Sequence, residues 1–300
     1  MMIWNCKEGV KMKEHKGRIS RTGIKKQLRL LPGHLIVGLW SLFTLAMLFW
    51  ILAASLSTSP EIMQGKALKF ESGLHFENYV RAWSANSISI FFMNSLLYAV
   101  SAMVGSILIS APAAYVLARF VFKGNVVIKS GFVTAMSIPQ IMIVLPLFSM
   151  ATRAHLSGSK IVLILLYIGM QIPYTTTFLL ASFASLSRVY EEAAAIDGCS
   201  PMKTFWKIML PLAQPGIVTV GIFNFMNVWN EYFLSLIFAS SEKNMSVGPG
   251  LKSVLTSMQY TGDWGGLFAA VVIVFLPTLL LFVLLSKMII GGITNGGVKG

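Results

Sequence analysis

Polar side chains recur at helical spacing inside an otherwise apolar segment, residues 213–239. Asn224, Asn227 and Glu231 stand at positions i, i+3 and i+7, so they share one face of a continuous helix. Glu231 is the only acidic residue in any long apolar segment of the chain. A carboxylate in a bilayer is costly unless it faces a cavity or a partner. This face predicts a polar path or a subunit interface; the alternative is a helix end where Glu231 reaches interfacial water.

Further candidates for a translocation path are aromatic and amide side chains. Trp229 and Tyr232 lie beside the polar face, and they fit either an interfacial aromatic belt, the commoner use, or a surface that stacks on a sugar. Gln140 and Gln171 lie within two residues of prolines that interrupt apolar segments. Broken helices near polar side chains often mark substrate pathways in transporters, although plain packing kinks have the same sequence pattern.

The elements that must position these residues are membrane helices. Of the 300 residues, 55% are hydrophobic and only 12% charged, whereas soluble domains carry about 25% charged residues. Mean hydropathy is +0.72. The chain has six apolar segments close to the length of about 20 residues that a span needs: Leu35–Ser57, Phe91–Ala118, Ser130–Ala151, Ile161–Phe183, Ala213–Ala239 and Gly265–Ser286. We therefore predict an all-α integral membrane protein with six transmembrane helices.

The first apolar segment has a competing interpretation as a signal peptide. Ala53-Ala54-Ser55 resembles a cleavage site. However, the apolar core and the basic region before it are both too long for a signal peptide. We expect a retained helix.

The positive charge of the chain indicates membrane topology. The net charge is +13, and nine of the 24 Lys and Arg residues lie in residues 7–29, before the first span. They form no binding face, so we expect no nucleic-acid partner. Alternate connections carry 17 and seven of these cations, the larger number on the side of both termini. The positive-inside rule then places both termini in the cytoplasm.

Small residues recur on one stripe of the second apolar segment. They fall every four residues, at Ala102, Ser106, Ser110, Ala114 and Ala118, with Gly105 adjacent. Such stripes let membrane helices approach closely, so we expect tight helix packing here.

The sequence contains no catalytic or metal-binding pattern. Cys6 and Cys199 are isolated thiols, and the four histidines are widely separated. Residues 240–264 are a polar, glycine-containing loop between the fifth and sixth apolar segments, and residues 248–253 within it lack the core of a phosphate-binding loop. We expect no enzyme activity, no cofactor and no metal.

Residues 191–211, EEAAAIDGCSPMKTFWKIMLP, form a polar, helix-prone stretch between two apolar segments. It is too polar to span a bilayer, so we expect an ordered structure at the membrane surface. The residues predict a helix over 191–196, a turn at Asp197-Gly198, a second helix capped by Ser200 with Pro201 in its first turn, and an end at Leu210-Pro211. A displayed helix-turn-helix of this kind suits docking to a soluble partner.

This stretch resembles the EAA loop of ABC-importer permeases. The spaced pattern is filled at every position, by Glu192, Ala193, Ala194, Gly198, Ile208, Leu210 and Pro211. The chain end, residues 296–300, and the stretch 229–232 resemble the maltose-type carbohydrate permeases of that superfamily. The resemblance covers roughly residues 75–300 and leaves out the N-terminal tail.

The resemblance implies the type I ABC importer transmembrane-domain fold and a set of partners. These would be a cytoplasmic ABC ATPase dimer, a second permease subunit, an extracytoplasmic solute-binding protein, membrane lipid and a sugar substrate. Residues 192–211 would form the coupling helix in a groove of the ATPase. Glu192 would meet a basic residue there, and Asp197-Gly198 would provide the turn.

The expected organisation follows from spans and resemblance together. It consists of a basic cytoplasmic tail 1–34, a first transmembrane helix 35–57, an extracytoplasmic loop 58–90, a transmembrane core 91–289 with a cytoplasmic coupling loop 184–212, and a cytoplasmic tail 290–300. An ion-coupled secondary transporter remains an alternative, although one intramembrane acid is little for ion coupling. A membrane-embedded enzyme would need clustered reactive side chains that the sequence does not offer.

Overall fold

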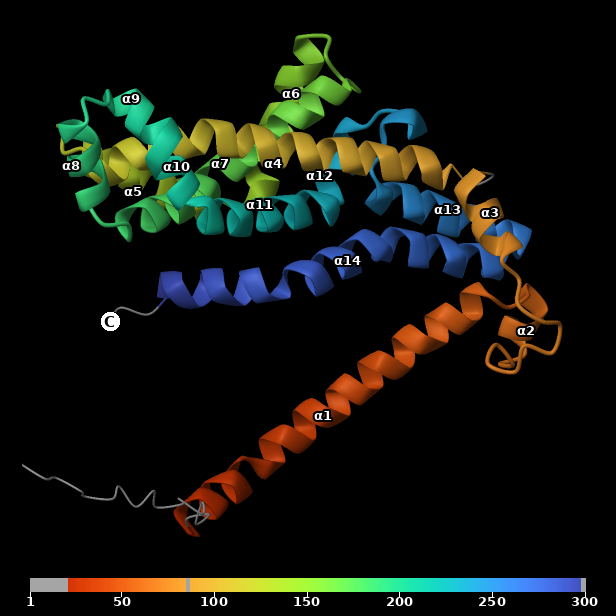
Figure 1. The fold of residues 1–300 in the computed structure, drawn as a ribbon. Helices are drawn as coiled ribbons and strands as arrows, with labels where there is room; N and C mark the ends of the chain where they lie inside the picture. The colour runs from red at the N-terminus through yellow and green to blue at the C-terminus, as the bar shows by residue number, and fades with distance from the viewer. Residues whose placement is uncertain (1–20, 85–86, 298–300) are drawn as a thin grey trace, which may run out of the picture. The chain divides into compact units, whose positions relative to one another are not determined.

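The computed structural model describes residues 21–84 and 87–297, and in that part of the chain all regular structure is helical (Figure 1). The chain divides into two units, residues 1–50 and 51–300. The first contains most of α1 (Arg21–Ser55), whose stretch Leu30–Ser55 is long and apolar enough to cross a membrane. Residues of α1 from Leu30 to Trp50 are exposed, as in Trp40 at 71%, which suits a helix surrounded by lipid.

Three helices pack side by side in the second unit: α4 (Ile88–Arg119), α7 (Lys160–Ala184) and α11 (Gln214–Trp229) (Figure 1). The predicted small-residue stripe lies in this packing, with Ala102, Ser106, Ser110 and Ala114 fully buried. A Cβ atom at Gly105 would lie only 2.6 Å from Ile168 of α7. The expectation of close helix approach is therefore confirmed.

Two of the predicted spans are not single helices. The third consists of α5 (Asn125–Met136) and α6 (Gln140–Arg153), which meet at a bend of 94°. Pro139 stands at this bend, where it has no N–H to continue a helical ladder. The fifth ends as α11 at Trp229 and resumes as the short α12 (Phe233–Phe238). Glu231 thus lies in a break, and the continuous face expected from Asn224 to Glu231 does not exist.

The two long connections contain helices of their own. Residues 58–90 hold α2 (Ser59–Met63) and α3 (Glu77–Ser84). Residues 240–264, expected as a polar loop, hold the 3₁₀ turn η2 (Glu242–Asn244) and α13 (Val247–Thr261). Pro249 and the glycines beside it fall in the first turn of α13, where a missing donor costs little. Val247 and Val254 of α13 are buried, so this helix belongs to the packed core.

The last helix, α14 (Trp264–Gly297), packs against α3 and α11. Among the described residues four helices are long and apolar enough to cross a membrane, and six spans result if each of two bent pairs counts as one. The second bent pair joins Pro201–Leu212 to Gln214–Trp229 at 73°. The four long helices and the α5–α6 pair fall on five of the predicted apolar segments, and α11 with α12 falls on the remaining one, whereas Pro201–Leu212 lies in the predicted surface segment.

Candidate functional site

The segment 184–212, called the coupling segment below, is an ordered helix-turn-helix at one end of α4 and α7 (Figure 1). Its elements are α8 (Val189–Ile196), α9 (Pro201–Thr204), the π-helical turn η1 (Phe205–Met209) and α10 (Leu210–Leu212). Gly198 has φ +71°, the left-handed conformation expected for the turn. The Ser200 hydroxyl accepts a hydrogen bond from the Lys203 N–H, as expected of an N-cap.

The predicted end of this segment is confirmed to within one residue. The helical run that begins at Pro201 ends at Leu212, directly after Leu210-Pro211, and the chain bends by 73° at Ala213 before α11. Pro211 lies in the last turn of this run, just after the π-helical turn η1. The fifth span therefore begins after a bend.

The two adjacent glutamates of α8 have opposite environments. Glu191 Oε1 accepts a hydrogen bond from the Tyr115 hydroxyl at 2.8 Å, and its Oε2 lies 3.2 Å from Nε of Arg119. Glu192 is exposed and has no hydrogen bond or ion pair within the described residues. Between α8 and α4 lies an open cavity of about 350 Å³, lined in part by both glutamates and by Cys199.

The remaining residues of the EAA-like pattern divide between surface and interior. Ala193, Asp197, Gly198 and Pro211 are exposed, Ile208 and Leu210 are half-buried, and Ala194 is buried. Large apolar side chains accompany the exposed residues: Ile196 is 87% exposed, Met202 67% and Trp206 47%. Such a patch on a polar segment is typical of a protein-docking surface.

A second cavity of about 600 Å³ lies between the α5–α6 bend, α7 and the end of α11. Four of the predicted path residues line it, namely Gln140, Gln171, Asn227 and Glu231. The sequence did not indicate Tyr167 and Tyr174, which also line it. A cavity lined by both polar and aromatic side chains can bind a small polar molecule.

Two other predicted path residues lie away from this cavity. Asn224 is fully buried, and its amide donates hydrogen bonds to the hydroxyls of Ser106 at 2.9 Å and Thr175 at 2.8 Å. Trp229 is 2% exposed and stacks on Phe225, with ring centroids 5.7 Å apart. Asn224 joins α11 to α4 and α7, and Trp229 fills the core.

Glu231 caps the short helix α12. Its Oε1 accepts the Leu234 N–H at 2.7 Å, and its Oε2 accepts the Ser235 N–H at 3.2 Å and the Tyr167 hydroxyl at 2.8 Å. These three donors satisfy the carboxylate in an otherwise apolar region. Sequence reasoning identified Glu231 but missed its partner, because Tyr167 lies 64 positions away.

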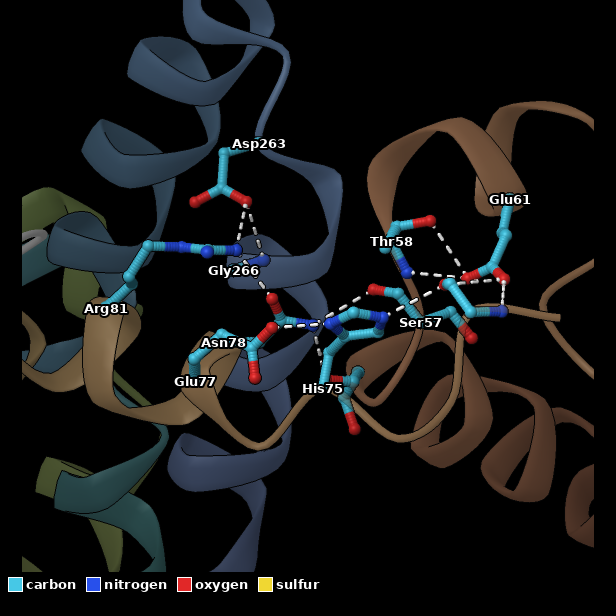
Figure 2. Close-up of polar contacts among 11 residues, drawn as sticks. Ser57, Thr58, Glu61, His75, Glu77, Asn78, Arg81, Asp263 and Gly266 are labelled. Carbon is cyan, nitrogen blue, oxygen red and sulfur yellow. Dashed lines mark hydrogen bonds and ion pairs between the residues drawn. The ribbon is translucent and has the colours of Figure 1, made fainter. Parts of the chain in front are cut away.

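A polar network fastens residues 55–84 to the start of α14 (Figure 2). The Asn78 amide donates to the carbonyls of Ser55 and Ser57, each at 3.0 Å, and Arg81 lies 3.2 Å from Asp263. Within the network Glu61 accepts hydrogen bonds from the backbone N–H groups of Thr58 and Ser72 and from both of their hydroxyls. These bonds, the Thr58 N–H first, lower the Glu61 pKa to about 2.

No group of three or more His, Cys, Asp or Glu side chains that could hold a metal ion occurs in the described part of the chain. The structure thus has three features: an exposed apolar and acidic surface on the coupling segment, a polar cavity between helices, and a hydrogen-bonded segment, residues 55–84, beside the start of α14.

Comparison with known proteins agrees with these features. Residues 106–293 match the family described as binding-protein-dependent transport system inner membrane component. The diacetylchitobiose uptake system permease protein NgcG of Streptomyces coelicolor is 33% identical over 88% of this chain and 87% of its own. The trehalose/maltose transport system permease protein MalG of Thermococcus litoralis is 29% identical over 93% of this chain and 99% of its own.

One solved structure has the same fold. It belongs to a bacterial ABC transporter involved in the import of the acidic polysaccharide alginate. Its TM-score is 0.76 at 20% identity, over 89% of this chain and 98% of that one. The fold, the matched family and the ordered surface segment agree, and the chain therefore belongs to the binding-protein-dependent transport system inner membrane components, as a multi-pass permease subunit of an ABC importer and not an enzyme.

Proposed function

We propose that this chain forms the path by which an ATP-driven importer moves a sugar or small oligosaccharide across the cytoplasmic membrane. The carbohydrate substrates named for its relatives support this class. The cavity between α7 and α11 suits it chemically. Amides of Gln140, Gln171 and Asn227 offer donors and acceptors to sugar hydroxyls, and Tyr174 offers an aromatic face.

The observation that carries the proposal is the exposed surface of the coupling segment. Glu192, Ile196 and Met202 are displayed there on two short helices joined by the Gly198 turn. An acidic side chain among exposed apolar ones fits a groove with a basic residue on a soluble partner. We assign this surface to the cytoplasmic ABC ATPase dimer, which supplies the energy of transport.

The remaining partners follow from the same assignment. The extracytoplasmic solute-binding protein delivers substrate to the side that holds α3 and α13, and a second permease subunit completes the path. Lipid surrounds the apolar helices. Residues 1–34 and 290–300 are cytoplasmic tails in this scheme, 58–90 is extracytoplasmic, and 91–289 is the transmembrane core with both termini inside.

The chemistry of Glu231 weighs against ion-coupled transport. An ion-coupled carrier needs an intramembrane acid that exchanges its proton or cation during the cycle. The Glu231 carboxylate instead accepts three hydrogen bonds, from two backbone N–H groups and from Tyr167, which hold it as part of the helix break.

The experiment is uptake by proteoliposomes that contain the chain together with its ATPase, its second permease subunit and its solute-binding protein. Disaccharides bound by the solute-binding protein serve as labelled substrates. We expect accumulation with internal ATP. A matched sample without ATP but with an imposed proton or sodium gradient should accumulate nothing, and accumulation there would refute the proposal.

A further inference from the structure

Two side chains at the end of α4 contact the start of the coupling segment, α8 and η1. Tyr115 and Arg119 stand one helical turn apart on α4. Arg119 Nη2 donates to the Leu186 carbonyl at 2.8 Å, at the start of the segment, and Arg119 Nε lies 3.2 Å from Glu191 of α8. The Tyr115 hydroxyl donates to the other carboxylate oxygen of Glu191 at 2.8 Å. We call Tyr115, Arg119 and Glu191 the anchor cluster.

Aromatic packing extends this attachment to η1. The Tyr115 ring lies with its centroid 5.1 Å from that of Phe205 and 5.6 Å from that of Phe183 at the end of α7. The Phe205 side chain is only 3% exposed, so a buried aromatic contact attaches η1 to α4. The start of the segment, α8 and η1 are thus attached to one turn of α4.

The anchor cluster is shielded, unlike the surface beside it. The Arg119 side chain is 6% exposed and that of Glu191 21%. If α8 moved away from α4, the Arg119–Glu191 pair would separate and leave a shielded charge without its partner. This cost opposes separation of the two helices. The hydrogen bond from Tyr115 to one carboxylate oxygen of Glu191 is directional, and the ion pair with Arg119 lies at the other oxygen, so together they hold α8 against α4.

Helix α4 also connects the anchor cluster to the packed core of α4, α7 and α11. The α4 stripe of Ala102, Ser106 and Ser110 packs without exposed surface against its neighbours. Ser106 accepts a hydrogen bond from Asn224 of α11, whose C-terminal end lines the polar cavity. Close-packed helices transmit displacement because their interfaces do not deform continuously.

We propose that the two glutamates of α8 have separate roles: Glu192 binds the ATPase, and the Glu191 anchor cluster passes the movement of the coupling segment to α4. Glu191, Arg119 and Tyr115 are positioning residues in this scheme. The inference rests on the proposed function, because it requires that the coupling segment receives the ATPase.

The test compares Glu191→Gln with Glu192→Gln in the assembled transporter. Both changes remove one negative charge from α8 with little change of shape. We expect Glu191→Gln to keep the ATPase bound and its basal hydrolysis intact, while substrate moved per ATP falls by about tenfold, the scale of one lost charge-assisted hydrogen bond. We expect Glu192→Gln to weaken ATPase binding instead, with the ratio unchanged in the complexes that still form.

Two further variants separate positioning from simple loss of structure. The double variant Arg119→Glu with Glu191→Arg exchanges the two charges. It should transport more substrate per ATP than either single variant. Tyr115→Phe keeps the ring packing and removes one hydrogen bond, so it should lower the ratio mildly with the complex intact.

The inference is overturned if Glu191→Gln transports with the normal ratio, or if it releases the ATPase as Glu192→Gln does. A failure of the proposed function looks different. In that case Glu192→Gln and Glu192→Lys both keep the ATPase and full transport, whatever Glu191→Gln does.

Discussion

The hydroxyl of Tyr167 on α7 donates a hydrogen bond of 2.8 Å to the carboxylate of Glu231, which stands in the break between α11 and α12. The same carboxylate receives the first N–H groups of α12, from Leu234 and Ser235. One acidic side chain therefore holds a broken helix together beside the polar cavity. Its position explains how a charge is tolerated in an apolar segment without an opposite charge.

We first predict that Glu231→Leu impairs transport while the assembled complex persists. Leucine leaves two backbone N–H groups and one hydroxyl without their acceptor, at about 1–3 kcal/mol each. Glu231→Gln, which retains one acceptor oxygen, should have a smaller effect, and Tyr167→Phe a smaller one still. Uptake and the yield of purified complex are measured together, and normal uptake by the leucine variant would exclude a role for Glu231 in the path.

A second prediction concerns the turn of the coupling segment. Gly198 has φ +71°, and apart from its chain neighbours no atom of this chain lies within 4 Å of the place where a Cβ would stand, so within this chain a substitution strains only the backbone. Gly198→Val should cost about 1–2 kcal/mol in the turn and reduce co-purification of the ATPase and uptake. Gly198→Asn is the matched control, since asparagine tolerates this conformation. Equal behaviour of both variants would show that the turn is not required.

The third prediction concerns topology, which we test by cysteine labelling in a background with Cys6→Ser and Cys199→Ser. Exposed positions suit the test, and these are Leu74, Ser157 and Lys252 for the outside and Lys123 for the inside. Native Cys199 serves as a second inside probe in a chain that carries Cys6→Ser alone. We expect an impermeant thiol reagent to label the first three from outside and the last two only after the membrane is opened. Labelling of Cys199 from outside would invert the topology.

The fourth prediction concerns α13 and the solute-binding protein. Deleting this helix would disturb the core, because Val247 and Val254 are buried, so substitutions of its exposed residues are the sharper test. Tyr260 is 88% exposed and Lys252 is also exposed. Tyr260→Ala with Lys252→Glu should raise the concentration of binding protein needed to stimulate ATP hydrolysis by about tenfold, with basal hydrolysis unchanged.

Lys123→Glu is the matched control for that experiment, because it changes an exposed lysine on the opposite side of the expected membrane. It should leave stimulation by the binding protein unaffected. Normal stimulation of the α13 double variant would mean that α13 does not contact the binding protein.

The fifth prediction concerns pH and the network around Glu61 (Figure 2). Hydrogen bonds lower the folded-state pKa of Glu61 to about 2, whereas an unfolded Glu has a pKa of about 4.3. Its contribution to stability is therefore complete above the unfolded value and is lost as the pH falls toward 2. The Thr58 and Ser72 amides should stay protected from hydrogen exchange below about pH 4 and become exposed only as the pH approaches 2, where the folded-state carboxylate is protonated.

Glu61→Ala should expose the same two amides to exchange at neutral pH. Glu71→Ala is the control, because Glu71 is exposed and pairs only with Lys66 across 3.3 Å. Protection of Thr58 and Ser72 that survives Glu61→Ala would contradict the role assigned to this carboxylate.

Most of the coupling segment was predictable because its determinants are local. A left-handed glycine, a serine cap and a proline in a first helical turn each act within a few residues, and Gly198, Ser200 and Pro201 all behave as expected. The second helix likewise ends at Leu212, within one residue of the predicted end. Local rules failed for α13, where burial of one helix face decided the structure although the segment contains glycines.

By itself, the sequence determined the six apolar segments, the ordered surface segment and the residue types at the candidate sites, since hydropathy, charge and turn preference are properties of neighbours in the chain. Only the tertiary structure decided which polar groups meet. It turned Glu191 toward Arg119 and Tyr115 and left Glu192 exposed, and it paired Glu231 with Tyr167. The physical reason is that a buried polar group must find donors or acceptors wherever helix packing brings them, and packing joins residues that no local pattern connects.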